Sequence, residues 1–156
     1  AMTDNSLELT ITRTLDAPRA LVWKAWSTKE HIEKWWCPKP WKARFTGFEL
    51  AAGGAFDCDM SGPNGEGHTV SGSILDVVPQ SRIVFTDLLI SGWRPAPNPF
   101  MGVTAIFTME DEGARTRYVA RCFHISAEDA KRHAEMGFYE GWETVATQLE
   151  EIAKSL

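Results

Sequence analysis

SAEDAKRHAEMGFYEGWETVATQLEEI, residues 126–152, constrains the fold more than any other segment of this sequence. Ser126 with Asp129 three residues later is typical of a helix start, because a serine side chain can accept a hydrogen bond from the backbone there. Apolar residues then recur at helical spacing, at Ala130, Ala134, Phe138, Gly141, Val145, Leu149 and Ile152. We therefore predict that a single amphipathic helix of about thirty residues closes the chain.

A helix of this length needs a wide apolar surface to cover, and the preceding residues predict a sheet. Strand-like segments follow one another from Trp41 to Ile125. Short turn signals separate them, at Gly53-Gly54, Gly62-Pro63-Asn64-Gly65, Pro79-Gln80 and Asp111-Glu112-Gly113. Links this short permit hairpins but no parallel crossovers, so the sheet should be antiparallel.

The N-terminal part adds one strand and two short helices. Leucine and isoleucine alternate with polar residues over residues 7–15, which predicts a half-buried strand. Asp16 and Pro18 supply a helix start, and Pro38 and Pro40 end a second short helix. We predict one α+β domain over residues 1–156 with a helix-grip fold. In this fold a curved antiparallel sheet of six to seven strands wraps around the long C-terminal helix.

Composition and charge narrow the range of partners. The formal net charge is −5, so no basic surface is available for nucleic acid. No apolar run approaches the roughly 18 residues of a membrane span, and no signal peptide opens the sequence. We expect a cytoplasmic protein without membrane insertion. Cys37, Cys58 and Cys122 are widely spaced and should be reduced thiols.

Strand alternation predicts which side chains face the helix. In residues 56–60 the carboxylates Asp57 and Asp59 should face water, which turns the three intervening side chains inward. The same reasoning directs further side chains inward: Trp41, His68, Phe107, Cys122 and His124. Residues 82–90 are apolar on both faces, and two orientations stay open. Either Ile83, Phe85 and Asp87 point inward, or Val84, Thr86 and Leu88 do.

With this order of elements, the chain resembles the SRPBCC superfamily of helix-grip proteins, which includes START lipid-transfer domains and the birch-pollen allergen. Within it the sequence is most similar to bacterial proteins related to the C-terminal domain of the activator of the heat-shock protein 90 ATPase. The matching motifs are Asp16-Ala17-Pro18, Val22-Trp23, Trp35-Trp36, Gly53-Gly54-Ala55-Phe56, Gly72, Val77-Val78-Pro79, Arg82-Ile83-Val84-Phe85-Thr86 and Gly141-Trp142.

The resemblance implies a cavity under the last helix and a hydrophobic or aromatic small-molecule ligand. It favours the orientation that turns Phe85 and Asp87 inward, although relatives commonly carry an aromatic residue where Asp87 stands. Trp93, in the proline-rich loop, is a candidate lid. The expected ligand-binding residues are Trp41, Phe56, Cys58, Met60, His68, Phe85, Asp87, Trp93, Phe107, His124, Phe138 and Trp142.

Two other functions stay open. One is a cyclase-like or hydratase-like enzyme that uses His68, His124 or Asp87 for proton transfer. The other is an interaction module for a chaperone ATPase, and a homodimer is also compatible with the sequence. Nucleotide-binding motifs and metal-ligand spacings are absent from the sequence, so we expect no cofactor, no metal site and no assigned catalytic residue. His133 is expected to be exposed.

Overall fold

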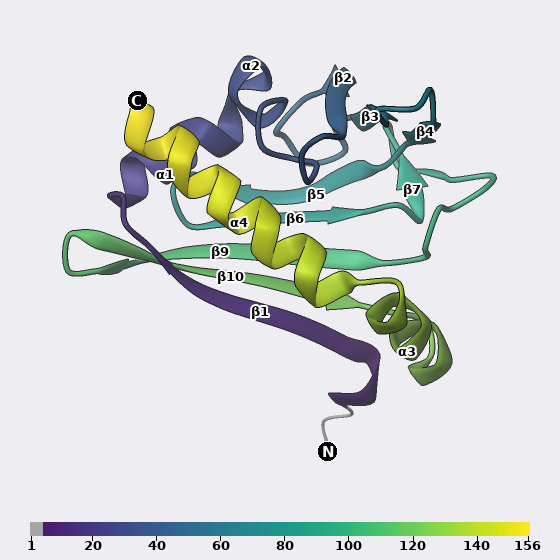
Figure 1. The fold of residues 1–156 in the computed structure, drawn as a ribbon. Coiled ribbons are helices and arrows are strands. Elements are labelled where there is room, and N and C mark those ends of the chain that lie inside the picture. Colours follow the sequence, from purple (N-terminus) through teal and green to yellow (C-terminus); the bar gives the residue numbers. More distant parts are fainter. Residues whose placement is uncertain (1–4) are drawn as a thin grey trace.

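A long helix, α4, lies across one face of a five-stranded antiparallel sheet in the computed structural model, which describes residues 5–156 (Figure 1). After a short 3-10 helix (Asn5–Leu7), the elements are β1 (Glu8–Leu15), α1 (Arg19–Ser27), α2 (Lys29–Ile32), β2 (Lys42–Phe48), β3 (Phe56–Ser61), β4 (Gly67–Val70), β5 (Ser73–Val78), β6 (Arg82–Thr86), β7 (Leu89–Ile90), β8 (Arg94–Pro95), β9 (Thr104–Glu112), β10 (Arg115–Phe123), α3 (Ala127–Glu135) and α4 (Phe138–Ser155).

The large sheet has the strand order β1-β10-β9-β6-β5, and every neighbouring pair is antiparallel. Side chains alternate between core and solvent along each long strand, as expected for a sheet with one covered face. In β10 the residues Tyr118, Ala120 and Cys122 are buried, which confirms the predicted alternation. Phe107 on β9 is flanked by Ala120 on one side and Ile83 on the other. The predicted α+β helix-grip arrangement is therefore confirmed.

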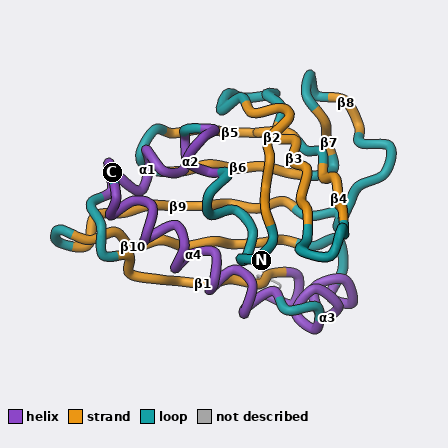
Figure 2. Tube along the Cα trace, turned by 45° about the horizontal axis from the view of Figure 1, so that its top comes forward, coloured by secondary structure: helices purple, strands orange, loops and turns teal. Residues whose placement is uncertain are grey.

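The remaining strands do not belong to the large sheet. A small sheet contains β2, β3 and β4, and a separate hairpin contains β7 and β8 (Figure 2). The chain changes sheets at Ser71-Gly72, because β4 pairs with β3 whereas β5 pairs with β6. A single bridge between Ala55 and Ser73 connects the two sheets. The predicted single sheet of six to seven strands is thus divided into five strands and three.

The prediction of one continuous closing helix was wrong. Ser126 caps α3 as predicted, with its Oγ accepting from the Asp129 N–H at 3.1 Å. The helix then ends at Glu135, and the chain turns at Gly137, which has a φ of +100°. Glycine adopts this left-handed conformation without the steric cost of a side chain, so it commonly ends helices. None of the helices in residues 5–156 is long and apolar enough to cross a membrane.

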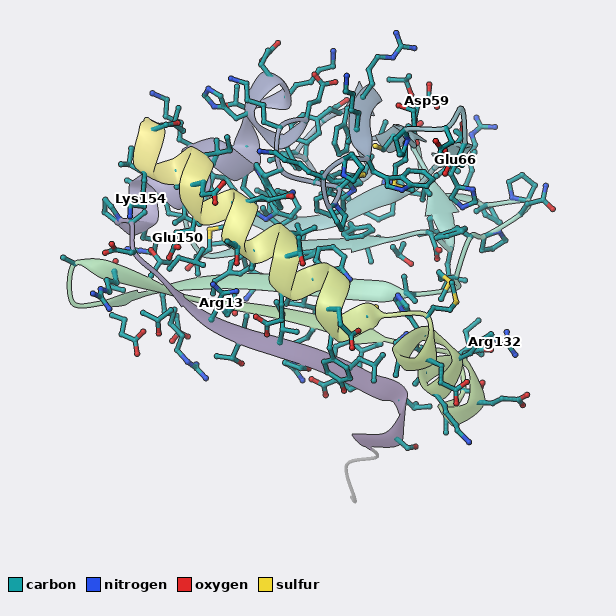
Figure 3. All side chains as sticks on the ribbon, in the orientation of Figure 1. Arg13, Asp59, Glu66, Arg132, Glu150 and Lys154 are labelled. Atoms are coloured by element: carbon teal, nitrogen blue, oxygen red, sulfur yellow. The ribbon has the colours of Figure 1, made fainter. Side chains whose placement is uncertain are left out.

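Polar side chains hold α4 against the rest of the molecule. The Gln148 amide donates to the carbonyls of Trp35 and Cys37 at 3.1 and 2.7 Å, and its oxygen accepts from the Lys39 N–H at 3.0 Å. Arg13 on β1 reaches the carboxylate of Glu143 on α4 at 3.0 Å (Figure 3). These contacts fix α4 against both β1 and the loop that follows α2.

Candidate functional site

A cavity of about 290 Å³ lies between the two sheets and the first turns of α4. It reaches the surface near Phe100 and Met136, both of which are exposed. Eight of the twelve predicted ligand-binding residues line it: Phe56, Cys58, Met60, Phe85, Asp87, Phe107, Phe138 and Trp142. Strand alternation predicted Phe56, Cys58, Met60 and Phe107, helical spacing predicted Phe138, and the family resemblance favoured Phe85, Asp87 and Trp142.

Three predicted site residues lie elsewhere. Trp41 is half-buried and packs over Gly62, and Trp93 is 55% exposed with its indole against Gly53. His68 is also exposed, and its ring lies 4.3 Å from the Phe100 ring. His68 is on the same face of β4 as Val70 and opposite Met60, both of which line the cavity, but it lies beyond the edge of the cavity because β4 is the outer strand of the small sheet. None of these three residues is part of the cavity wall. Trp41 nevertheless packs against the hydrophobic core, and Trp93 lies outside the cavity that it was predicted to cover.

Aromatic rings form most of the cavity wall. Phe85 and Phe107 stack with an interplanar angle of 6° and a centroid distance of 5.8 Å. Trp36 and Trp142 meet edge to face at 5.3 Å. Trp36 was absent from the predicted site, although the Trp35-Trp36 pair was visible in the sequence. Adjacent residues point in different directions around a helical turn, so Trp35 enters the core while Trp36 reaches the cavity.

Asp87 is a buried charged residue of this wall, and only 2% of its surface is exposed. Its Oδ2 accepts hydrogen bonds from the N–H groups of Met101 and Gly102, at 2.7 and 3.2 Å. Its Oδ1 accepts from the Val103 N–H at 2.8 Å. The orientation favoured by the family resemblance is confirmed. The hydrogen-bond partners of Asp87 are thus backbone N–H groups of residues 101–103.

His124 is buried behind the cavity wall and contacts a second histidine. Its Nδ1 lies 2.9 Å from the Leu7 carbonyl oxygen, which can only accept, so Nδ1 carries the proton. Its Nε2 therefore accepts from Nδ1 of His133, at 2.8 Å. The prediction that His133 is exposed was wrong, because the break at Gly137 turns α3 so that His133 reaches the cavity.

Burial keeps His133 and Cys122 neutral near pH 7. Desolvation lowers the pKa of His133 to about 4, and neighbouring His124 lowers it further. Desolvation raises the pKa of the Cys122 thiol to about 12, with a smaller contribution from the charge of Asp87. The Cys122 sulfur lies 4.0 Å from Nε2 of His124. The three donor atoms of Cys122, His124 and His133 lie within 4.8 Å of one another.

His68, His124 and Asp87, the candidate proton-transfer residues of an enzyme, do not lie close together. Asp87 lines the cavity, whereas His68 is exposed beside Phe100 and is not part of the cavity wall. His124 is occupied by Leu7 and His133. The trio of His68, His124 and Asp87 therefore does not form an acid–base group around the cavity.

An apolar cavity between an antiparallel sheet and the helix that lies across it is typical of the helix-grip fold. The chain belongs to the Activator of Hsp90 ATPase homolog 1-like protein family, whose family model matches residues 16–154. The match extends from α1 through nearly all of α4 and leaves out β1.

Solved structures agree with this assignment. A crystal structure of a protein from Nitrosomonas europaea is 36% identical, with a TM-score of 0.92, and covers 98% of this chain and 97% of that chain. A protein from Mycobacterium smegmatis is 25% identical, with a TM-score of 0.81 and 98% coverage of both chains. A solution structure of a protein from Arthrobacter aurescens shares the fold. It is 24% identical, with a TM-score of 0.84, and covers 99% of this chain and 91% of that chain. Among curated proteins, no match was found.

Proposed function

We propose that the protein binds a compact, largely apolar aromatic molecule in the cavity between the sheets and α4. The observation that carries this proposal is the cavity of about 290 Å³ with walls of stacked and edge-to-face rings. Binding sites for small molecules are typically concave and apolar, with a few placed polar groups. Aromatic ligands gain further from such walls because rings prefer offset or edge contacts with other rings.

The volume of the cavity sets the size of the ligand. Ligand pockets usually range from about 300 to 1,000 Å³, so this cavity is at the lower end. A fused two-ring compound fits such a volume better than a long-chain lipid does. We therefore assign the site to ring compounds of low molecular mass.

Asp87 sets the polarity of the ligand. A carboxylate offers about four acceptor positions, and the backbone N–H groups of residues 101–103 use three of them. The remaining position favours a ligand that carries a hydroxyl or amine donor. A carboxylate ligand is disfavoured, because it places a second negative charge beside Asp87 where water is excluded.

A matched panel of ligands tests this proposal. The protein is purified under native conditions and titrated calorimetrically with 2-naphthol, 2-naphthoate and palmitate, with EDTA present so that metal ions do not contribute. We expect saturable binding of 2-naphthol at one site, with 2-naphthoate at least about tenfold weaker and palmitate undetected. Equal affinity for the two naphthalene compounds would contradict the role of Asp87. Absence of binding for all ring compounds would contradict the proposed function.

A further inference from the structure

Three side chains that commonly bind metals meet at the wall of the cavity. Cys122 is on β10 and His124 follows two residues later, so both side chains are on the covered face of the sheet. His133 comes from α3, which the Ser126 cap and the Gly137 break position over the end of β10. The three donor atoms are within 4.8 Å of one another. They come from two elements, so the fold itself assembles the group.

We propose that Cys122 Sγ, His124 Nε2 and His133 Nδ1 bind a zinc ion. One sulfur and two imidazole nitrogens form a donor set that suits this borderline-soft cation. Three protein ligands leave the fourth tetrahedral position for water or a polar group of a cavity ligand. The proposal is independent of the proposed small-molecule function, because it requires only the protein and the ion.

The measured distances are close to those of a tetrahedral site. Zinc binds sulfur at about 2.3 Å and imidazole nitrogen at about 2.0–2.1 Å, so its donors lie about 3.3–3.6 Å apart. The distance from Cys122 Sγ to His124 Nε2 is 4.0 Å, and the distance from His124 Nε2 to His133 Nδ1 is 2.8 Å. Small side-chain rotations bring both distances into this range. On binding, the Cys122 thiol releases its proton to solvent, and the neutral His133 ring changes tautomer, with its one proton moving from Nδ1 to Nε2.

The surroundings support coordination by His124. Its Nδ1–H donates to the Leu7 carbonyl at 2.9 Å, which fixes the ring and directs the Nε2 lone pair toward His133 and Cys122. A backbone carbonyl that binds the second nitrogen of a histidine is the usual outer contact of metal-binding histidines, and it makes the coordinating nitrogen more basic. His124 is thus held in the tautomer that zinc requires.

The local charge also favours a cation. Asp87 is buried, and its partners are backbone N–H groups that carry no full positive charge. Its carboxylate lies near enough to act electrostatically on both Cys122 and His133. Nearby Arg121 is already ion-paired, and Arg132 on α3 points away from the cavity (Figure 3). A bound zinc ion would face one thiolate and this buried carboxylate, which balance its charge.

Cobalt(II) provides a direct probe, because it replaces zinc and its absorption spectrum reports both coordination number and sulfur ligation. The full chain, reduced and freed of metal, is titrated with cobalt(II) and then with zinc(II). We expect intense four-coordinate absorption and a sulfur-to-cobalt charge-transfer band that saturate at one equivalent and disappear when zinc is added. The Cys122→Ser variant should lose the charge-transfer band, and His133→Gln should weaken cobalt binding at least about tenfold.

Two variants serve as controls for the metal site. Cys58→Ser changes another buried cysteine, and His31→Gln changes an exposed histidine, so both should retain the wild-type cobalt spectrum. The melting temperature of each metal-free variant shows whether it is folded. If Cys122→Ser does not fold, His133→Gln and His31→Gln suffice, because only the first should weaken binding. A weak six-coordinate spectrum, or a charge-transfer band that persists in folded Cys122→Ser, would overturn the proposal.

Discussion

Asp87 and Val103 bind each other twice. The Asp87 N–H donates to the Val103 carbonyl at 3.2 Å, and the Val103 N–H donates to Asp87 Oδ1 at 2.8 Å. The same carboxylate accepts from the two preceding N–H groups, so one side chain holds the segment that leads into β9. This contact ends β6 at Thr86 rather than at Ile90. Asp87 is therefore a structural element of the cavity wall as well as its polar group.

Replacing Asp87 by Asn should destabilise the protein by about 1–3 kcal/mol. An amide keeps one acceptor oxygen but turns an NH2 group toward backbone N–H donors, which leaves a buried donor unpaired. The Asp76→Asn variant is the control, because Asp76 pairs with Arg82 on the exposed surface, where such pairs contribute about 0–1 kcal/mol. Urea denaturation of both variants measures the difference. Equal stability of the two variants would show that the carboxylate does not hold the loop.

Gln148 should also stabilise the protein, because it attaches α4 to the loop that follows α2. Gln148→Leu has a similar size but leaves the carbonyls of Trp35 and Cys37 and the N–H of Lys39 without their side-chain partner. We expect a loss of about 2–4 kcal/mol, since each buried unpaired group costs about 1–3 kcal/mol and relaxation recovers part of it. Thr144→Ala on the same helix is exposed and should change stability by less than about 0.5 kcal/mol. A small effect of Gln148→Leu would mean that water replaces these bonds.

The two glycines of the closing segment should respond to alanine in opposite directions. Gly141 is helical, and a methyl group there meets no atom within 4 Å, so Gly141→Ala should stabilise the protein by about 0.5–1 kcal/mol. Gly137 has a φ of +100°, so Gly137→Ala should destabilise it by about 1–2 kcal/mol. Thermal denaturation compares the two variants. A shift of the same sign in both would contradict the assigned backbone geometry.

Buried thiols should make the protein less stable at high pH. Desolvation raises the pKa of Cys37 from 9.0 to about 11 and the pKa of Cys58 from 9.0 to about 12. Because the unfolded chain loses these protons first, the stabilisation is complete below about pH 9 and is lost as pH rises through the native pKa values. The free energy of unfolding should fall above pH 9 by up to about 1.4 kcal/mol per pH unit for each thiol.

Denaturation under reducing conditions at several pH values between 8 and 11 measures this slope. The double variant Cys37→Ala with Cys58→Ala is the comparison, because lysine and tyrosine ionisation contributes equally to both proteins. The variant should show the shallower decrease. Equal slopes for the wild type and the double variant would mean that the thiols ionise as readily in the native protein as in the unfolded chain.

Sequence patterns predicted the parts of the fold that depend on periodicity. The two-residue alternation located Phe56, Cys58, Phe107 and Cys122 correctly, because burial on one face of a strand constrains side-chain type. The break at Gly137 could not be predicted from the apolar stripe, which continues through it at helical spacing. Glycine can occur both inside a helix and just after the end of one. Only the packing of α3 shows that the helix is interrupted at Gly137.

The site was predicted less completely than the fold. The partners of Asp87 are backbone N–H groups, which every residue except proline has, so no residue type indicates them. The contact between His124 and His133 depends on how α3 turns after β10, and spacing along the chain does not determine that angle. His68 was wrongly predicted to line the cavity for a different reason. It follows the strand alternation, but it lies on an outer strand that no helix covers.

Filling the cavity with a larger side chain at Gly141 should abolish binding of aromatic molecules between the sheets and α4. Gly141 lines the cavity, and an added side chain has open space there, so Gly141→Leu should occupy the ligand volume without disturbing the helix. Glu151→Leu places the same side chain on an exposed position of α4 and serves as the control. Calorimetric titration with 2-naphthol should show one site in wild type and in Glu151→Leu, and at least tenfold weaker binding in a folded Gly141→Leu protein. Undiminished binding in Gly141→Leu would contradict the account, because the ligand would then bind outside this cavity.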